Sequence, residues 1–207
     1  HERLMVIEVM GRYAGYTALV PAMAGASDRC VIPEHKFDIE KLTDLLMKDR
    51  RDNESNYSVV LVSEGAMFEG GEMTFSNQDT DAYGHKKLGG IGDLISSELQ
   101  KRAPKYCNGE SISTINQRMS YMTRSGHPDT IDSIVPMVYG NLAIDLIMDG
   151  KSGRMVCLKD GRYDNVPFEV VTEYEKKIDV ERFYDTERYR PHYHNCMGMT
   201  QFIMTSG

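Results

Sequence analysis

Residues 1–15, HERLMVIEVMGRYAG, indicate the fold class, because an apolar run in them is followed at once by glycine and arginine. Residues 4–9 (LMVIEV) are apolar and partly β-branched, which predicts a strand buried in a sheet. Gly11 and Gly15 end this run, and glycine lets a backbone turn and come close to a ligand. A buried strand that leads into such a turn is typical of an α/β domain, where ligands bind beyond the carboxyl ends of the strands.

Apolar runs and helical periodicity then alternate along the chain. Further strands are predicted at residues 29–33, 57–62 and 111–122. Helices are predicted at residues 16–25, 37–48, 91–102 and 132–148. This alternation predicts an α/β fold with an open, mostly parallel sheet flanked by helices.

The remaining segments are less regular. The glycine-rich, polar stretch 69–90 predicts a long surface loop. Residues 155–171 predict a hairpin around a Lys-Asp-Gly-Arg turn. The extended, charged and aromatic tail from Glu173 is expected to wrap over a surface or to reach a neighbour. We therefore expect a ligand-binding α/β domain at residues 1–150, and a hairpin with a C-terminal extension at residues 151–207.

The composition narrows the class of protein. A net charge of −7 over 207 residues argues against a nucleic-acid binder, which usually has a basic surplus on one face. No uninterrupted apolar stretch of about 20 residues predicts a membrane span. The four cysteines are far apart and form no CxxC pair, which predicts reduced thiols and a cytoplasmic location. His192 and His194 alone do not make a metal site. The chain starts at His1 directly before a strand, so we expect that sequence upstream has been lost.

Polar residues follow three of the predicted strands. Gly11 and Arg12 can face an anion, or they can form an ordinary turn with an arginine in solvent. Glu64 can accept hydrogen bonds from sugar hydroxyls, or it can be a solvated residue at a strand end. Arg124 can bind a phosphate through its guanidinium fork, or it can form a surface ion pair. Lys86 belongs to a basic pair in the predicted loop, where solvation is the simpler interpretation.

Several ordered motifs resemble those of the 6-phosphofructokinases. Residues 1–15 are similar to the family signature, in which H-x-R, a strand and E-V-M-G-R-x-A-G follow one another. The resemblance continues in residues 22–34 (AMAGASDRCVIPE), 62–66 (VSEGA) and 121–132 (YMTRSGHPDTID). The stretch 154–171 and the tail resemble the longer bacterial branch of the family.

This resemblance implies a role for each motif. Arg3 would reach across a subunit interface to the 6-phosphate of fructose 6-phosphate. Arg12 would be the catalytic residue, near the phosphoryl group in transfer, and Glu64 would hold sugar hydroxyls. The segment from Tyr121 to Arg124 would bind the 6-phosphate. The implied substrate-binding residues are Arg3, Met10, Gly11, Arg12, Glu64, Tyr121, Met122, Thr123 and Arg124, and no metal ligand is among them.

The sequence departs from the family pattern in two places. Many members have histidine where Tyr121 stands. They also have a second cross-subunit arginine where this chain has Ile115, and Arg118 is a nearby substitute out of register.

The glycine-rich donor loops of the family, and its T-I-D aspartate that acts as general base, belong upstream of His1. Thr130-Ile131-Asp132 opens a helix instead.

The resemblance therefore implies the substrate-binding half of a cytoplasmic, oligomeric phosphofructokinase that makes fructose 1,6-bisphosphate in glycolysis. The oligomer would be a dimer or tetramer with shared sites. Magnesium and the phosphoryl donor, ATP or pyrophosphate, would be bound mainly by the other half, so this chain alone is expected to be inactive. The alternative is a non-catalytic regulatory subunit that binds sugar phosphates. Neither a nucleic acid nor a membrane is expected as a partner.

Overall fold

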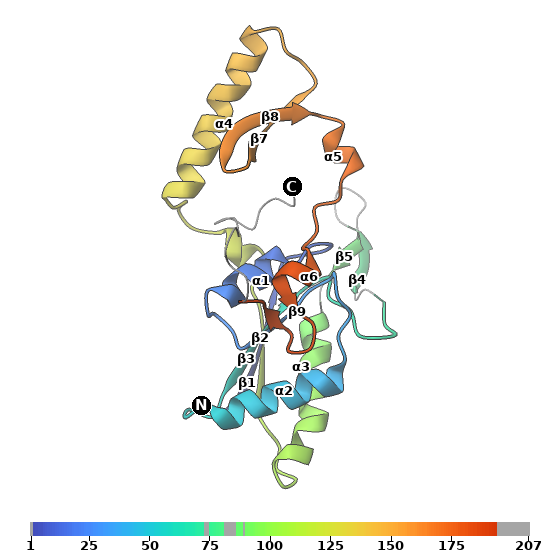
Figure 1. The fold of residues 1–207 in the computed structure, drawn as a ribbon. Helices are drawn as coiled ribbons and strands as arrows, with labels where there is room; N and C mark the ends of the chain where they lie inside the picture. Colours follow the sequence, from blue (N-terminus) through green and yellow to red (C-terminus); the bar gives the residue numbers. More distant parts are fainter. Residues whose placement is uncertain (1, 73–74, 81–85, 89, 194–207) are drawn as a thin grey trace. The chain divides into compact units, whose positions relative to one another are not determined.

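The computed structural model describes residues 2–72, 75–80, 86–88 and 90–193, with the segments 75–80 and 86–88 described as backbone (Figure 1). The chain folds into two compact units. The first combines the chain up to Thr123 with a returning segment that starts at Lys177, and the second starts at Arg124 and ends its described part at Lys176.

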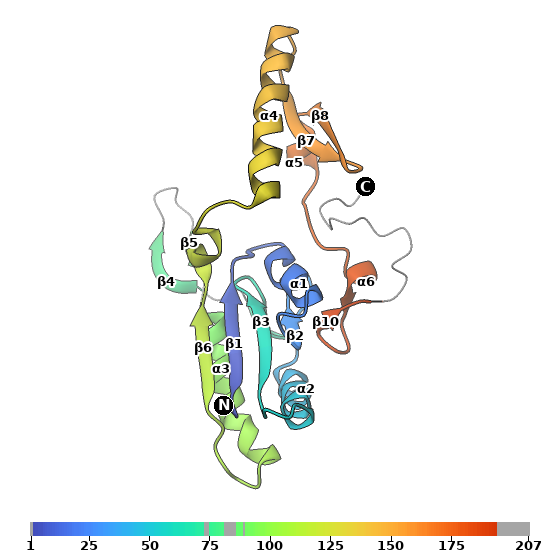
Figure 2. The ribbon, with the colours of Figure 1, turned by 90° about the vertical axis from the view of Figure 1, so that its left-hand side faces the viewer.

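A four-stranded parallel sheet forms the centre of the first unit. Its strands are β1 (Leu4–Val9), β2 (Arg29–Val31), β3 (Ser58–Ser63) and β6 (Thr114–Arg118). They lie in the order β2-β3-β1-β6, and every neighbouring pair is parallel (Figure 2). The predicted mostly parallel α/β sheet is therefore confirmed.

The fourth strand is shorter than predicted. β6 ends at Arg118, and Ser120 takes up a positive φ of 37°. That conformation breaks the strand, and residues Ser120–Arg124 form the short 3-10 helix η2. The expectation that the strand continues to residue 122 was therefore wrong.

Helices cover both faces of this sheet. They are α1 (Tyr16–Met23), α2 (Ile39–Asp52), α3 (Ile91–Arg102) and the 3-10 helix η1 (Ala103–Tyr106). Right-handed crossovers place α2 and α3 side by side on one face and α1 on the other (Figure 2). The start of α2 is fixed by Asp38, whose carboxylate accepts a hydrogen bond from the backbone N–H of Glu40 at 2.7 Å.

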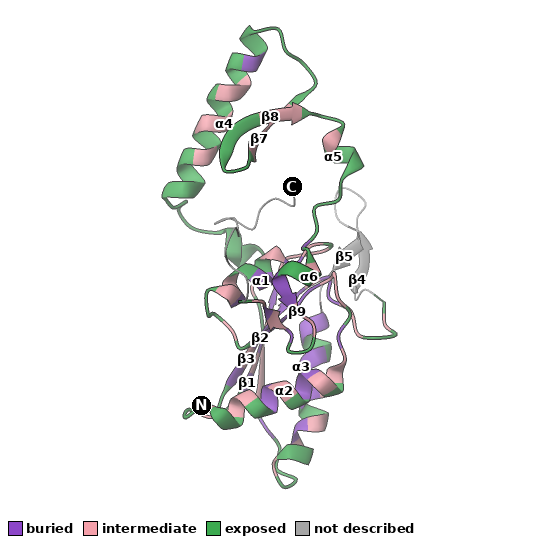
Figure 3. Ribbon diagram, viewed as in Figure 1, coloured by how far each residue is buried: buried purple, intermediate pink, exposed green. Residues whose placement is uncertain are grey.

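The apolar core lies between the sheet and these helices (Figure 3). Leu42 and Leu46 lie four residues apart on α2, and both are buried. Ile95 and Leu99 repeat this spacing on α3. The strands contribute Val6, Val60 and Val62, which are also buried. The predicted amphipathic helices thus supply the core as their periodicity indicated.

The tail returns to the first unit and covers the edge strand β2. It contains α6 (Val180–Phe183), β9 (Tyr184–Asp185) and β10 (Arg190–Pro191). The backbone N–H of Cys30 donates to the carbonyl oxygen of Tyr189 at 2.8 Å, and the hydroxyl of Tyr184 donates to the carbonyl oxygen of Cys30 at 2.7 Å. The described part of the tail therefore wraps over a surface, as expected, and blocks an edge that could pair with another chain.

The second unit holds a long helix and the predicted hairpin. Helix α4 (Thr130–Met148) is followed by β7 (Arg154–Lys159) and β8 (Arg162–Pro167), which pair antiparallel, and by the short helix α5 (Val170–Glu173). Asp160 and Gly161 form the turn with φ values of 51° and 74°, and a two-residue turn of this hand suits the twist of a hairpin.

The predicted loop at residues 69–90 contains regular structure, so that expectation was wrong in part. The strands β4 (Phe75–Thr80) and β5 (Lys86–Leu88) form an antiparallel pair within it. The sequence of β4, FSNQDT, shows no apolar alternation beyond its first residue, so periodicity could not reveal it.

Candidate functional site

The carboxyl ends of β1, β3 and β6 meet at one edge of the sheet, because the three strands are parallel (Figure 2). Met10, Gly11 and Arg12 follow β1, Glu64 follows β3, and η2 begins shortly after β6. The structure therefore brings these predicted site residues to a single edge, with Tyr121, Met122 and Thr123 on η2.

Two of these loops are locked together by their backbones. The N–H of Glu64 donates to the carbonyl oxygen of Val9 at 2.9 Å, and the N–H of Gly65 donates to that of Gly11 at 3.0 Å. A Cβ on Gly65 would lie 1.9 Å from the carbonyl oxygen of Arg12, so only glycine fits there. Gly11 has a φ of 137°, a conformation that side-chain-bearing residues rarely adopt. The sequence Met-Gly-Arg is thus held in one fixed conformation beside Glu-Gly.

Glu64 is half-buried beside Gly11 and Arg12. Burial raises the pKa of its carboxyl above the usual range, and the nearby Glu8 adds to this; a hydrogen bond from the Gly11 backbone and the charge of Arg12 act in the opposite direction. The guanidinium of Arg12 also lies over the ring of Tyr13, 5.9 Å from its centroid. A carboxylate and a guanidinium at one position suit a ligand that carries both hydroxyl and phosphate groups.

Glu8 is a residue of this edge that the sequence analysis missed. Its side chain is buried, and its carboxylate accepts hydrogen bonds from the backbone N–H groups of Gly90 and Gly92, the latter at 2.8 Å. Arg118 lies 3.9 Å from it and also pairs with Asp93. Glu8 thus fixes the N-terminus of α3 to β1, where the helix dipole favours a negative charge. A glutamate inside the apolar run LMVIEV was the available signal.

Arg118 is therefore already paired. Its guanidinium is held by Glu8 and Asp93 within the same chain. Ile115, at the position where many relatives have an arginine, lies in β6 opposite Met5. These contacts argue against Arg118 as a substitute for the second arginine.

The residues of η2 are exposed at this edge. Tyr121 is 72% exposed and Met122 is 62% exposed, so both can reach a ligand or another chain. The hydroxyl of Thr123 donates to the carbonyl oxygen of Ser120 at 2.8 Å. Arg124 is the last residue of η2 and the first of the second unit, and its side chain is exposed.

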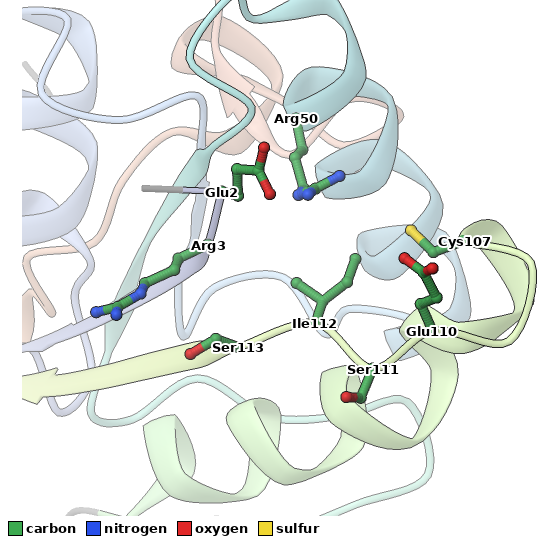
Figure 4. Close-up of a pocket in the computed structure, with 8 residues that line it drawn as sticks. All are labelled: Glu2, Arg3, Arg50, Cys107, Glu110, Ser111, Ile112 and Ser113. Carbon is green, nitrogen blue, oxygen red and sulfur yellow. The ribbon is translucent and has the colours of Figure 1, made fainter.

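Arg3 lies at the opposite edge of the sheet. It directly precedes β1, whereas Arg12 follows β1, and a six-residue strand is about 20 Å long. Arg3 lines a cavity of about 320 Å³ together with Glu2, Arg50, Cys107, Glu110, Ser111, Ile112 and Ser113. In Figure 4 its guanidinium points away from Arg50, towards the outside of this group. The structure does not bring Arg3 to the other site residues within one chain.

The described residues were compared with the usual pattern of metal ligands and disulfides. Among the described residues, no group of three or more His, Cys, Asp or Glu side chains could hold a metal ion. Cys30, Cys107 and Cys157 are free thiols, and burial raises the pKa of the Cys30 thiol to about 12. Cys196 and His194 lie outside the described residues.

Comparison with known proteins relates this fold to one family. The family model described as phosphofructokinase matches residues 1–147, which is more than half of the chain. The chain belongs to the phosphofructokinase family. This match includes Arg3, the Met-Gly-Arg loop, Glu64 and the whole of η2, so the predicted resemblance is confirmed for the region that holds the candidate site.

Individual relatives agree with this membership. The chain is 33% identical over 187 residues to a pyrophosphate–fructose 6-phosphate 1-phosphotransferase of Amycolatopsis mediterranei, covering 90% of this chain and 52% of the relative. It is 32% identical over 183 residues to an ATP-dependent 6-phosphofructokinase of Corynebacterium efficiens, covering 88% of this chain and 51% of the relative. The chain thus spans about half the length of these relatives.

Solved structures support the same fold. A pyrophosphate-dependent phosphofructokinase from Marinobacter aquaeolei superimposes with a TM-score of 0.68 at 20% identity, over 93% of this chain and 45% of that one. Phosphofructokinase from Pichia pastoris superimposes with a TM-score of 0.64 at 20% identity, over 84% of this chain and 18% of that one.

Proposed function

We propose that this chain is the fructose 6-phosphate-binding part of a phosphofructokinase that forms fructose 1,6-bisphosphate. The observation that carries the proposal is the backbone lock that holds Arg12 next to Glu64 at the carboxyl edge of the sheet. Phosphoryl transfer depends mainly on positioning and on neutralising charge, which a rigid pair of this kind can provide.

Each residue has a role in this proposal. The carboxylate of Glu64 accepts hydrogen bonds from sugar hydroxyls. Arg12 lies near the phosphoryl group and stabilises its charge. Arg124 binds the 6-phosphate as a charged fork, and Tyr121 donates its hydroxyl hydrogen. Thr123 does the same when its hydroxyl turns from the carbonyl oxygen of Ser120 to the phosphate. Met10 and Gly11 line the sugar with backbone and an apolar side chain.

Arg3 acts on a site in another subunit. The length of β1 separates it from Arg12, so its proposed contact with the 6-phosphate requires a second chain. The proposal therefore includes a homo-oligomer, a dimer or tetramer, with sites shared between subunits. A glycolytic role accords with the activities in the names of its relatives, and a cytoplasmic location is part of the proposal.

The phosphoryl donor and magnesium are proposed to bind mainly outside this chain. Its relatives include both pyrophosphate- and ATP-dependent enzymes, so either donor remains open. The described residues hold no cluster of three or more metal-binding side chains, and magnesium would supply positive charge beside the phosphoryl donor. Because the general base is also proposed to lie outside this chain, the chain alone should not transfer phosphate. A regulatory subunit that binds sugar phosphates without catalysis is the alternative.

Titration with fructose 6-phosphate tests the binding role. The protein, assembled with a phosphofructokinase half that this chain lacks, is titrated by calorimetry as wild type and as the Arg124→Ala and Arg124→Lys variants. Losing a charge-assisted hydrogen bond costs about 1.5–3 kcal/mol, which weakens binding about tenfold or more. The lysine variant should recover part of this loss, because it restores charge without the fork.

Arg162→Ala serves as the matched control, since Arg162 is an exposed arginine of the second unit on β8. Its affinity should equal that of the wild type. Equal affinity of the wild type and the Arg124→Ala variant would remove Arg124 from the site. No heat of binding with any of the proteins would contradict the proposed function as a whole. Binding without turnover in the assembled protein would favour the regulatory alternative.

A further inference from the structure

Glu34 is a half-buried carboxylate outside the candidate site, and it joins two distant segments of the first unit. Both of its oxygens accept a hydrogen bond from the backbone N–H of Gly15 at 3.1 Å. One of them also accepts from the N–H of Ile178 at 2.9 Å. Gly15 ends residues 10–15, which we call the Arg12 loop, and Ile178 belongs to the tail. We call this set of hydrogen bonds the Glu34 clamp.

A further hydrogen bond lies beside the clamp. The hydroxyl of Tyr16 donates to the carbonyl oxygen of Lys177 at 2.8 Å. Burial raises the pKa of this hydroxyl, and the charge of Glu34 adds to the increase, so the group keeps its proton at neutral pH. Gly15 and Tyr16 are thus joined to Lys177 and Ile178, the two residues with which the chain returns to the first unit.

The start of α1 is a favourable place for the carboxylate of Glu34. The N-terminal N–H groups and the dipole of a helix attract negative charge. Gly15 is the N-cap of α1 and has no side chain with which to cap it. A Cβ on Gly15 would lie 2.5 Å from the Cβ of Ile32, so a capping residue does not fit there. The carboxylate at this helix end therefore comes from a residue 19 positions along the chain.

The Arg12 loop is held at both of its ends. Near its start, the carbonyl oxygen of Gly11 accepts a hydrogen bond from the N–H of Gly65 at 3.0 Å. At its end, the Glu34 clamp holds the N–H of Gly15. Arg12 lies between these two attachments, so its position depends on both.

The tail that joins the clamp is firmly packed on the first unit. Ile178 is buried, and so are Tyr184 and Tyr189. Strand β10 of the tail lies beside α1 and β2 (Figure 1). The docked tail therefore keeps the N–H of Ile178 in place beside the carboxylate, and through this carboxylate it restrains the end of the Arg12 loop.

We propose that Glu34 is a positioning residue, which holds Arg12 in its place in the candidate site while the tail is docked. Glu34 acts through the N–H of Gly15 and does not touch the substrate. The coupling of tail and loop rests on contacts within this chain alone. Its effect on ligand binding rests on the proposed function, in which Arg12 belongs to the site of fructose 6-phosphate.

Hydrogen exchange of the full chain tests the coupling without any ligand. The wild type is compared with the Glu34→Ala and Glu34→Gln variants. The amides of the Arg12 loop should exchange at least about tenfold faster in the alanine variant, since losing a charge-assisted hydrogen bond shifts an equilibrium by about this factor. The glutamine variant should lie between the two, because it keeps the length of the side chain and one acceptor but loses the charge.

A substitution in the tail tests the coupling from the other side. Ile178→Pro removes the N–H that donates to Glu34 and leaves the sequence of the Arg12 loop unchanged. The amides of that loop should again exchange faster. Glu187→Gln is the matched control, since Glu187 is a tail carboxylate that pairs with α2 at 2.7 Å and not with the loop. Exchange in the loop of this control should stay within about twofold of the wild type.

Titration with fructose 6-phosphate separates positioning from folding. In the assembled protein, Glu34→Ala should weaken binding about tenfold, as the loss of a charge-assisted hydrogen bond from Arg12 would, while the number of binding sites stays unchanged. Fewer sites at the affinity of the wild type would show that Glu34 has a structural role only. Circular dichroism checks that each variant is folded. Glu34→Gln, which keeps the shape of the side chain, decides the question if Glu34→Ala or Ile178→Pro does not fold.

Other results would overturn the proposal. One is unchanged exchange of the Arg12 loop in the folded Glu34 and Ile178 variants, and another is equally fast exchange in the Glu187→Gln control. Absence of fructose 6-phosphate binding by the wild type would contradict the proposed function instead. The exchange experiment would still decide whether the clamp couples the tail to the loop, so the two failures can be told apart.

Discussion

The backbone N–H of Gly65 donates to the carbonyl oxygen of Gly11 at 3.0 Å and joins the two loops that carry Arg12 and Glu64. The space between them is so small that a Cβ on Gly65 would lie 1.9 Å from the carbonyl oxygen of Arg12. The two loops therefore cannot change position independently, and a change at either glycine should affect both.

Gly65→Ala should destabilise the first unit and displace Arg12. Forcing a methyl group into a filled space costs about 1–3 kcal/mol, and here the obstacle is backbone, which cannot rotate away. Urea unfolding measures this cost. Gly140→Ala is the control, because a Cβ there meets nothing within 4 Å and alanine favours a helix by about 1 kcal/mol. Unchanged stability of Gly65→Ala would show that the loops are not locked.

Glu64→Gln should make the protein more stable at pH 7 and, under the proposed function, weaken its binding of fructose 6-phosphate. Burial raises the pKa of Glu64 in the folded state, so folding favours the protonated carboxyl. The resulting contribution to stability is full below the pKa of Glu64 in the unfolded chain. It is lost as the pH rises through the higher pKa of Glu64 in the folded protein. The glutamine variant is uncharged at every pH, so it keeps this contribution to stability.

Thermal unfolding of both proteins from pH 4 to pH 7 checks this prediction. The two midpoints should lie close together at pH 4, and the glutamine variant should become the more stable one as the pH increases. A difference that is independent of pH, or that grows towards acid, would contradict a raised pKa at Glu64.

Arg29→Met should release the tail and cost about 3–5 kcal/mol, because it leaves a largely buried carboxylate unpaired. The guanidinium of Arg29 holds Asp49 of α2 at 2.5 and 2.6 Å, and it also donates to the carbonyl oxygen of Arg188 at 2.7 Å. The side chains of Arg29 and Asp49 are only 7% and 17% exposed. Urea unfolding and limited proteolysis of the tail give the measurement.

Lys41→Met is the control for this change. Lys41 also bridges α2 to the tail, at 2.7 Å from Glu187, but the carboxylate is 83% exposed. Exposed pairs contribute about 1 kcal/mol or less, so this variant should stay close to the wild type. Equal effects of the two substitutions would show that burial does not decide the strength of these bridges.

The sequence predicted the structural features that depend on residues close together in the chain. The β-branched runs of β1 and β3 and the periodicity of α2 and α3 are local, and the glycines after the strands marked the site edge. It did not predict contacts between distant residues. The pairing of Cys30 with Tyr189 and the return of Glu8 to Gly92 join segments far apart in the chain, and no local pattern encodes them.

The exposed side of α4 shows a further limit. Its sequence correctly predicted a long helix, but periodicity alone cannot tell which apolar side the hairpin covers and which side is exposed. The position of Arg3 is similar. Its motif implied a role in the site, whereas the parallel sheet places it at the opposite edge from Arg12, so the proposed role requires another subunit.

Mixed oligomers should therefore restore sites that neither parent has. Arg3→Ala and Arg124→Ala are each introduced into the assembled protein. The two variants are then mixed in equal amounts and allowed to exchange subunits. In a hybrid pair, one interface combines the intact Arg124 of one subunit with the intact Arg3 of the other. Random pairing into dimers then gives about a quarter of the sites wild-type affinity for fructose 6-phosphate. Calorimetric titration counts the tight sites.

A mixture of Arg12→Ala with Arg124→Ala is the matched control. In the proposed arrangement, Arg12 and Arg124 serve a site in their own subunit, so every site in a hybrid lacks one of them. Each parent again carries one substitution, as in the Arg3→Ala mixture, but this mixture should give no tight sites. Tight sites in the control, or none in the Arg3 mixture, would mean that Arg3 does not complete a site across a subunit interface. Arg3 would then have no part in the site, because the roughly 20 Å length of β1 separates it from Arg12 of its own chain.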